Sequence, residues 1–195
     1  MNRPLTSLSP DYFERMFQGS QDPWNLESSA YEAAKYRATV AALETRRFAR
    51  ALEVGCARGV LTRQLAPHCD ALLAIDVSGT ALKAARERCA DLRHVLFANM
   101  VFPKFAPATR FDLLILSEVV YYWDDSDIRA AGDWIARHLL PGGYLLLVHW
   151  TGTTDYPQTG DGAVCKLRSA LGSIVNVVTA CREAAYRLDL WCRPS

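Results

Sequence analysis

The sequence predicts an α/β fold: a doubly wound, mostly parallel sheet of seven strands with an antiparallel final strand and an N-terminal helical lid. Three observations predict it. From residue 50 onward, short apolar runs alternate with helical patterns, as in successive βαβ units. The runs at 111–116 and 144–148 are almost continuously apolar, which is typical of strands buried on both faces. Near the end, two strand-like segments are joined by a turn too short for a parallel crossover.

The alternation gives each element an approximate place. We expect strands at residues 50–54, 71–75, 93–97, 111–116, 144–149, 174–181 and 186–192. Helices are expected at residues 58–67, 78–90, 125–139 and 162–171. Pro141-Gly142-Gly143 predicts a sharp turn between a helix and the fifth strand.

Two helices are expected before residue 50. Ser9 and Pro10 are typical of a helix start. Ser28 and Ser29 can cap a second helix over residues 30–45. Asp22-Pro23-Trp24 lies in the polar loop between them, where a tryptophan is less readily explained by core packing.

Length and composition indicate one globular domain. The chain has 195 residues, half of them hydrophobic, which suffices for a full core. Residues 1–45 are expected to form a helical cap on the main domain, residues 46–195. A net charge of +1 gives no bulk reason to expect a nucleic acid or an anionic membrane as partner.

The cysteines and the apolar runs bear on location. None of the six cysteines forms a Cys-x-x-Cys pair, so neither a zinc site nor a redox motif is visible, and no metal is expected. No signal segment or membrane-length apolar run is present. We therefore expect a cytoplasmic protein with reduced thiols.

Polar and glycine residues gather where the predicted strands end, the edge at which open α/β sheets bind ligands. They are Glu53, Gly55 and Gly59 after the first strand, Asp76 after the second, Asn99 and Met100 after the third, Ser117, Glu118, Tyr121 and Tyr122 after the fourth, and His149 and Trp150 after the fifth. Glycines allow the backbone to approach a ligand closely. An acid about 20 residues past them can accept both hydroxyls of a ribose.

Two nucleoside ligands compete for this edge. A nicotinamide dinucleotide expects G-x-G-x-x-G, but Val60 occupies the place of the third glycine and Glu53 puts a negative charge near the pyrophosphate. S-adenosylmethionine carries no phosphate, and its ammonium, sulfonium and ribose suit one acid before the glycines and another after the second strand. The residues therefore favour S-adenosylmethionine.

Residues 50–149 resemble class I S-adenosylmethionine-dependent methyltransferases, which have a Rossmann-like fold. Residues 53–59 resemble their E-x-G-x-G-x-G loop, with Ala57 in place of the middle glycine, and Asp76 matches their ribose-binding acid. Residues 117–122 and 140–143 resemble the end of their fourth strand and the turn before their fifth. Asn99 departs from the aspartate often found near the adenine, although its carbonyl can still accept from the adenine amino group.

A narrower resemblance is to the NodS-type group, named for the rhizobial enzyme that N-methylates the amino-sugar end of nodulation-factor oligosaccharides. It is carried by Asp22-Pro23-Trp24, Tyr31-Glu32, Lys35-Tyr36-Arg37 and residues 53–57. It implies methyl transfer from S-adenosyl-L-methionine, with S-adenosyl-L-homocysteine as product, to an amine of a small molecule or saccharide. A hydroxyl acceptor, a nicotinamide-dependent oxidoreductase and a non-catalytic cofactor-binding protein stay open as alternatives.

The site prediction has two parts. The cofactor-binding residues are expected to be Glu53, Gly55, Cys56 through its backbone amide, Ala57, Gly59, Asp76, Val77, Asn99, Met100, Ser117, Arg37 and Trp24. The catalytic residues are expected to be His149, Glu118, Tyr121 and Tyr122, with Tyr31, Trp150 and Asp155 facing the substrate. His149 is the candidate base because an amine must lose a proton before it attacks. Each has a structural alternative: Asp76 can cap the next helix, and His149 can be a core residue.

Overall fold

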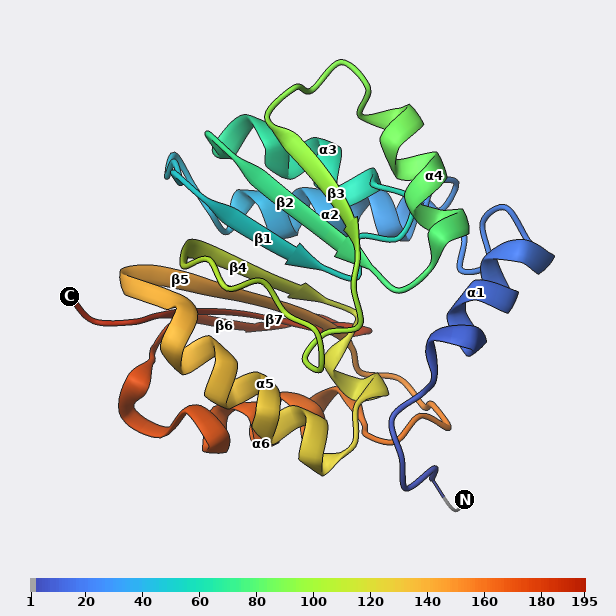
Figure 1. Cartoon of the computed structure of the whole chain (residues 1–195). Coiled ribbons are helices and arrows are strands. Elements are labelled where there is room, and N and C mark those ends of the chain that lie inside the picture. Colours follow the sequence, from blue (N-terminus) through green and yellow to red (C-terminus); the bar gives the residue numbers. More distant parts are fainter. Residues whose placement is uncertain (1–2) are drawn as a thin grey trace. The chain divides into compact units, whose positions relative to one another are not determined.

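A computed structural model of the protein describes residues 3–195 (Figure 1). The chain divides into two compact units. The glycine-loop unit consists of residues 9–100, and the C-terminal unit consists of residues 101–195 together with residues 3–8. The predicted cap of residues 1–45 stays a prediction, and its first two residues lie outside the described part.

The glycine-loop unit holds three parallel strands in the order β3-β2-β1. Its elements are α1 (Pro10–Gly19), α2 (Ala30–Ala41), β1 (Ala51–Val54), α3 (Val60–Leu65), η1 (Ala66–His68), β2 (Leu72–Asp76), α4 (Gly79–Arg88) and β3 (Val95–Asn99). Leu52, Ala74 and Ile75 are fully buried, as the apolar runs predict. In Figure 1, α2 and α3 lie behind these strands.

Side-chain caps start the helices of this unit. The Ser9 and Ser29 hydroxyls accept from backbone amides of the first turns of α1 and α2, which confirms both predicted starts. The end of α2 differs from the prediction, because the helix stops at Ala41 rather than near residue 45. Glu44 takes a left-handed conformation with φ 53°, which ends a helical run.

The C-terminal unit holds four strands in the order β4-β5-β7-β6. Its elements are β4 (Phe111–Ser117), η2 (Val120–Tyr122), α5 (Asp125–His138), β5 (Leu139–Trp150), α6 (Gly160–Leu171), η3 (Gly172–Ile174), β6 (Asn176–Arg182) and β7 (Tyr186–Cys192). β4 and β5 are parallel, whereas β7 runs antiparallel to β5 and to β6. The antiparallel end of the sheet is thereby confirmed.

Helices α5 and α6 lie side by side below the strands of this unit in Figure 1. A Cβ atom added to Gly132 of α5 would lie only 2.8 Å from Cβ of Ala170 in α6. Glycine at that position therefore allows the two helix backbones to approach closely.

The predicted turn at residues 141–143 lies inside β5, which begins at Leu139 instead of near residue 144. The register with β4 shifts between Phe111 and Leu113, and Gly142 has a left-handed φ of 74°. The C-terminal tail continues the hydrogen bonding: Gly142 N donates to Arg193 O, 2.8 Å, and Arg193 N donates to Gly143 O, 2.9 Å. These bonds keep the glycine segment within an irregular strand.

Candidate functional site

The predicted site residues fall into two groups, one in each unit. In the glycine-loop unit, the loop after β1 turns through left-handed conformations at Gly55, Ala57 and Gly59, with φ values of 76°, 48° and 75°. Ala57 thus adopts a left-handed conformation, which glycine takes without strain but which costs alanine about 1 kcal/mol. At Gly59 an added Cβ would lie 3.1 Å from Ala85, so a side chain there would crowd α4.

Asp76 joins this loop to the loop after β2. Its Oδ2 accepts from Ala57 N and its Oδ1 accepts from Ser78 N, both at 2.8 Å. The side chain is 7% exposed, and burial raises its pKa while the backbone amides oppose that shift. The carboxylate therefore orders both loops, which is the capping alternative, and each oxygen retains a further lone pair for a ligand hydroxyl.

Glu53 is more deeply buried. The side chain is 2% exposed, and its Oε2 accepts from the Thr62 hydroxyl at 2.6 Å. Burial raises the pKa of Glu53 to about 7, despite the hydrogen bond from Thr62. A cation bound beside this group would favour its ionised form.

This pKa predicts pH-dependent binding of a cationic cofactor. Below pH 7 a ligand that needs the carboxylate must displace a proton, so S-adenosylhomocysteine should bind more tightly by up to about tenfold per pH unit as the pH rises toward 7. Isothermal titration calorimetry between about pH 5.5 and 8 measures the slope. Glu53→Gln should flatten it, and a slope unchanged in that variant would contradict this assignment.

Stability should change in the opposite direction. The folded protein holds the Glu53 proton up to a pKa of about 7, whereas the unfolded chain releases it near the ordinary glutamate pKa of 4.5. The free energy of unfolding therefore falls as the pH rises through that window, and more strongly in the wild type than in Glu53→Gln.

The other loop residues are held by backbone contacts. Gly55 N and Cys56 N both donate to Ile75 O, at 2.8 and 3.0 Å, so the Cys56 amide that was assigned to the cofactor supports the loop itself. Asn99 Nδ2 donates to Asp76 O and Val77 O, at 3.2 and 3.0 Å. These bonds use the donors of the amide and keep Oδ1 as the acceptor, as an adenine amino group would require.

Glu14 joins helix α1 by hydrogen bonds to the start of α4, and sequence reasoning missed this residue. Its carboxylate accepts from the Ser78 hydroxyl at 2.6 Å and from the Thr80 hydroxyl at 2.5 Å. The hydrogen bond from Ser78, followed by that from Thr80, lowers the pKa of Glu14 to about 2. No local motif marks Glu14, because its partners lie at the start of α4.

Asp22 orders the loop that contains Trp24. Asp22 accepts from Leu26 N at 2.6 Å and from Glu27 N at 3.0 Å, so the aspartate of the Asp-Pro-Trp motif closes its own loop. Trp24 packs edge-on against Phe17, with 5.4 Å between ring centroids.

Glu27 links that loop to residues near the glycine loop. It receives hydrogen bonds from Arg58 and Arg88, the second at 2.6 Å. Arg58 lies within the glycine loop itself. The Asp-Pro-Trp segment is therefore fixed relative to the glycine loop, which supports a role near the cofactor.

On α2, Tyr31 lies beside a buried ion pair. Lys35, 2% exposed, donates to Glu32 at 2.9 Å, and its Nζ lies 5.2 Å from the Tyr31 ring centroid. Arg37 is exposed on the same helix. The cofactor role of Arg37 and the substrate role of Tyr31 stay predictions.

In the C-terminal unit, Glu118 occupies the end of β4 next to Ser117. It has a left-handed φ of 57°, which is uncommon for a residue other than glycine and is found at functional sites. Its Oε2 accepts from the Tyr121 hydroxyl at 2.5 Å and from Trp150 N at 2.9 Å. Ser117 is paired with Val148 in the sheet.

His149 has a different environment from the one expected for a base. The side chain has no exposed surface, and its Nε2 accepts from Val120 N at 3.2 Å. That nitrogen must carry a lone pair, so the ring holds η2 beside β5. The geometry favours Glu118 over His149 as the group that takes a proton from an acceptor.

Three tyrosines form the tyrosine cluster: Tyr121, Tyr122 and Tyr156. The Tyr121 ring lies 4.6 Å from Tyr122 and stacks on Tyr156 at 5.4 Å, centroid to centroid. Burial raises the pKa of Tyr121 and of Tyr122 well above the ordinary value, so both phenols stay protonated. Tyr156 was not among the predicted site residues, although its exposed neighbour Asp155 was, and the substrate role of Asp155 stays a prediction.

Residues 3–195 contain neither a metal-ligand cluster nor a helix that could span a membrane. No group of three or more His, Cys, Asp or Glu side chains is arranged to hold a metal ion in that range. None of the helices described there has the length and apolarity that crossing a membrane requires.

Known proteins of similar sequence and structure identify the family of this chain. The family model of Nodulation protein S (NodS) matches residues 10–149. Nodulation protein S of Rhizobium tropici is 36% identical over 129 residues, 65% of this chain and 54% of that protein. Nodulation protein S of Sinorhizobium fredii (strain NGR234) is 33% identical over 144 residues, 73% of this chain and 67% of that protein. The chain thus matches between half and two thirds of the length of these relatives.

A solved structure matches more completely. The crystal structure of N-methyltransferase NodS from Bradyrhizobium japonicum WM9, in complex with S-adenosyl-L-homocysteine, has a TM-score of 0.82 and 26% identity. The match covers 95% of this chain and 98% of that one. Together with the seven strands, mostly parallel with an antiparallel end, it confirms the predicted fold class. With the family model matching most of its length, this chain belongs to the NodS family.

Proposed function

We propose that the protein is an S-adenosyl-L-methionine-dependent methyltransferase. The observation that carries this is the arrangement of Glu53 and Asp76: a buried carboxyl before the glycines and a carboxylate bonded to Ala57 N and Ser78 N. The two acids suit a cationic, phosphate-free nucleoside better than a pyrophosphate. The NodS protein of B. japonicum, crystallised with S-adenosyl-L-homocysteine and named an N-methyltransferase, supports the same reading.

The cofactor supplies a methyl group made electrophilic by its sulfonium, so the protein mainly has to align an in-line displacement. Asp76 is suited to the ribose, Asn99 to the adenine amino group, and Glu53 to the cationic end. Trp24, Tyr31 and Arg37 are proposed to border the cofactor from the N-terminal helices.

The acceptor is proposed to be an amine of a small molecule or saccharide. Glu118 takes the proton that leaves the ammonium, and the amine lone pair then attacks the methyl carbon. Aromatic faces such as those of Tyr121 and Tyr122 favour a cationic amine and its methylated product.

The proposed location rests on the cysteines, and the proposed type of acceptor rests on the net charge. We propose a cytoplasmic protein because its six cysteines are all free thiols, as a reducing compartment maintains. The net charge of +1 favours a small acceptor over a nucleic acid.

Thermal unfolding with separate ligands tests the cofactor. S-adenosylhomocysteine at about 100 times its dissociation constant should stabilise the protein by about 2.7 kcal/mol, a rise of several degrees. NAD at the same concentration should give no rise. A rise with NAD alone would favour an oxidoreductase instead.

Turnover tests the reaction. Incubation with radiolabelled S-adenosylmethionine and a glucosamine oligosaccharide should transfer label to the sugar. The matched acetylated oligosaccharide, which lacks a free amine, should stay unlabelled. Equal labelling of both would indicate a hydroxyl acceptor, and binding without labelling would indicate a protein that only binds the cofactor.

A further inference from the structure

The loop after β5, residues 151–159, contains Tyr156, which has no role in the reaction proposed above. The Tyr156 ring stacks on Tyr121 with an interplanar angle of 19° and meets Tyr122 edge-on at 4.7 Å. Tyr121 is 4% exposed, whereas Tyr122 and Tyr156 are half-buried. The loop therefore adds the third ring to the tyrosine cluster.

The tyrosine cluster lies next to a carboxylate. Tyr121 donates to Glu118 Oε2, and the same oxygen accepts from Trp150 N at the end of β5. A carboxylate flanked by aromatic rings is a site for an alkylammonium group, which the charge and the ring faces both attract. Tyr156 belongs to this site through its ring contacts with Tyr121 and Tyr122 and through a side-chain hydrogen bond with Tyr122.

Residues 3–8, here called the strap, fix the position of that loop. Arg3 Nη1 donates to Tyr156 O at 2.6 Å, to Gln158 O at 3.1 Å and to Thr154 Oγ1 at 3.5 Å. Gln158 N in turn donates to Tyr121 O at 3.1 Å. Arg3 thus gathers the loop backbone on either side of Tyr156.

The rest of the strap is anchored beside the tyrosine cluster. Ser7 Oγ donates to Asp127 at 2.5 Å and accepts from Asp124 N at 2.8 Å, at the start of α5. Leu8 N donates to Tyr122 O at 2.9 Å. The strap is therefore bonded to η2, to α5 and, through Arg3, to the loop.

We propose that Tyr156 recognises the ammonium group of the methyl acceptor, and that Arg3 is a positioning residue that acts through Tyr156. This inference rests on the proposed function. Without Arg3 the loop carbonyls lose their common donor, and the Tyr156 ring is no longer held against Tyr121. Cofactor binding does not depend on either side chain.

Steady-state kinetics with the glucosamine oligosaccharide test this inference. Tyr156→Leu keeps apolar volume but removes the ring, and should raise KM for the oligosaccharide about tenfold, as loss of a cation–aromatic contact does. Tyr156→Phe retains the ring but loses the hydrogen bond with Tyr122, so it should raise KM less than Tyr156→Leu does. Arg3→Gln should raise KM in the same direction.

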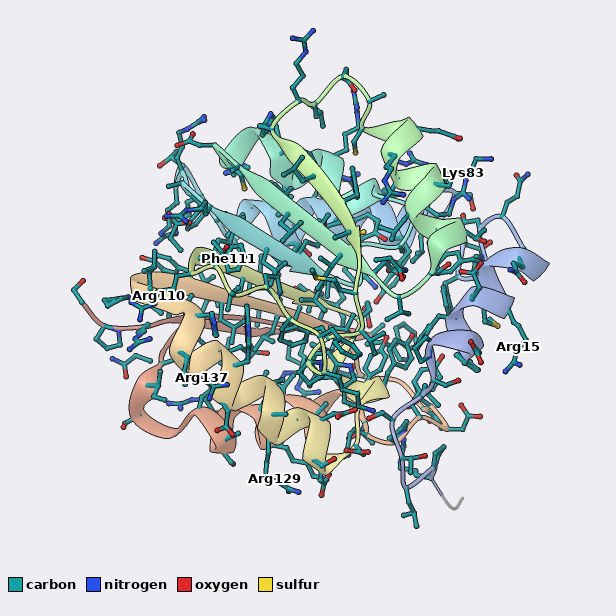
Figure 2. The ribbon with its side chains drawn as sticks, viewed as in Figure 1. Arg15, Lys83, Arg110, Phe111, Arg129 and Arg137 are labelled. Atoms are coloured by element: carbon teal, nitrogen blue, oxygen red, sulfur yellow. The ribbon has the colours of Figure 1, made fainter. Side chains whose placement is uncertain are left out.

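The double variant separates positioning from general damage. If Arg3 acts through Tyr156, Arg3→Gln with Tyr156→Leu should be no worse than Tyr156→Leu alone. Arg137→Ala, on an exposed residue of α5 in the same unit (Figure 2), is the matched arginine control and should change nothing. Multiplying effects in the double variant, or an unchanged KM in Tyr156→Leu, would overturn the proposal.

The thermal shift with S-adenosylhomocysteine distinguishes a failure of the proposed function from a failure of the roles of Tyr156 and Arg3. All variants should retain the shift of the wild type. A wild type without shift or methyl transfer contradicts the proposed function itself. An active wild type whose variants keep the same KM contradicts only the role of Tyr156 and Arg3.

Discussion

Replacing Asp76 with alanine should remove both cofactor binding and part of the fold's stability. The carboxylate accepts from Ala57 N and Ser78 N, and its loss leaves one partly buried and one buried amide without an acceptor. At about 1–3 kcal/mol for each unsatisfied group, the free energy of unfolding should fall by about 2–6 kcal/mol. Melting followed by circular dichroism should show a decrease of about 5–15 °C and no rise on adding S-adenosylhomocysteine.

Two further variants make the Asp76 result specific. Asp76→Asn keeps one acceptor oxygen but turns a donor toward an amide, so it should lose binding while destabilising less. Asp91→Ala removes a surface carboxylate paired with Arg63, whose side chain is 45% exposed, and should leave both the melting temperature and cofactor binding close to those of the wild type. Cofactor binding that survives in Asp76→Ala would contradict the assignment of this residue.

Changing Glu118 to glutamine should reduce turnover with the oligosaccharide about a hundredfold or more, as loss of a general base does. Glutamine retains an oxygen that can accept from Tyr121 and Trp150 N, so the surrounding hydrogen bonds are preserved. The shift in melting temperature with S-adenosylhomocysteine should be unchanged. Measurement of kcat at saturating acceptor isolates the chemical step.

His149→Asn provides the contrast for Glu118. Because His149 Nε2 accepts from Val120 N, its replacement should lower stability more than kcat per folded molecule. If His149→Asn abolishes turnover in protein that is fully folded while Glu118→Gln remains active, the base is His149, as the sequence alone predicts.

The fold was predictable because its signals are local. Apolar runs such as residues 111–116 mark buried strands, and Ser9 and Ser29 mark helix starts within one turn of the bonds they make. Pro141-Gly142-Gly143 shows the limit of such signals. Its turn chemistry is real, as φ at Gly142 shows, but tertiary bonds to Arg193 decide that it belongs to a strand.

The positions of the acids in the glycine-loop unit were easier to predict than the long-range contacts of Glu14 and Arg3. Glu53 and Asp76 stand at strand ends, so spacing along the chain is enough to find them. Glu14 and Arg3 are identified only by partners 64 and 151 or more residues away. A surface carboxylate or guanidinium in sequence carries no sign of such a partner.

Burial and backbone conformation distinguish His149 from Glu118 in the structure. His149 and Glu118 are both titratable residues at strand ends in the sequence, and nothing local distinguishes the environments of the two side chains. The complete burial of His149 and the left-handed backbone of Glu118 arise from packing and turn geometry that a single sequence does not reveal.

The strap has a consequence for how the chain is made. Residues 3–8 are translated before residues 9–100, yet the partners of Ser7 lie 117 or more positions later and those of Arg3 lie 151 or more positions later. All of residues 9–100 can emerge while this leading segment still lacks everything it binds. The strap thus settles only after the glycine-loop unit has been translated, and that unit can be complete before the C-terminal unit.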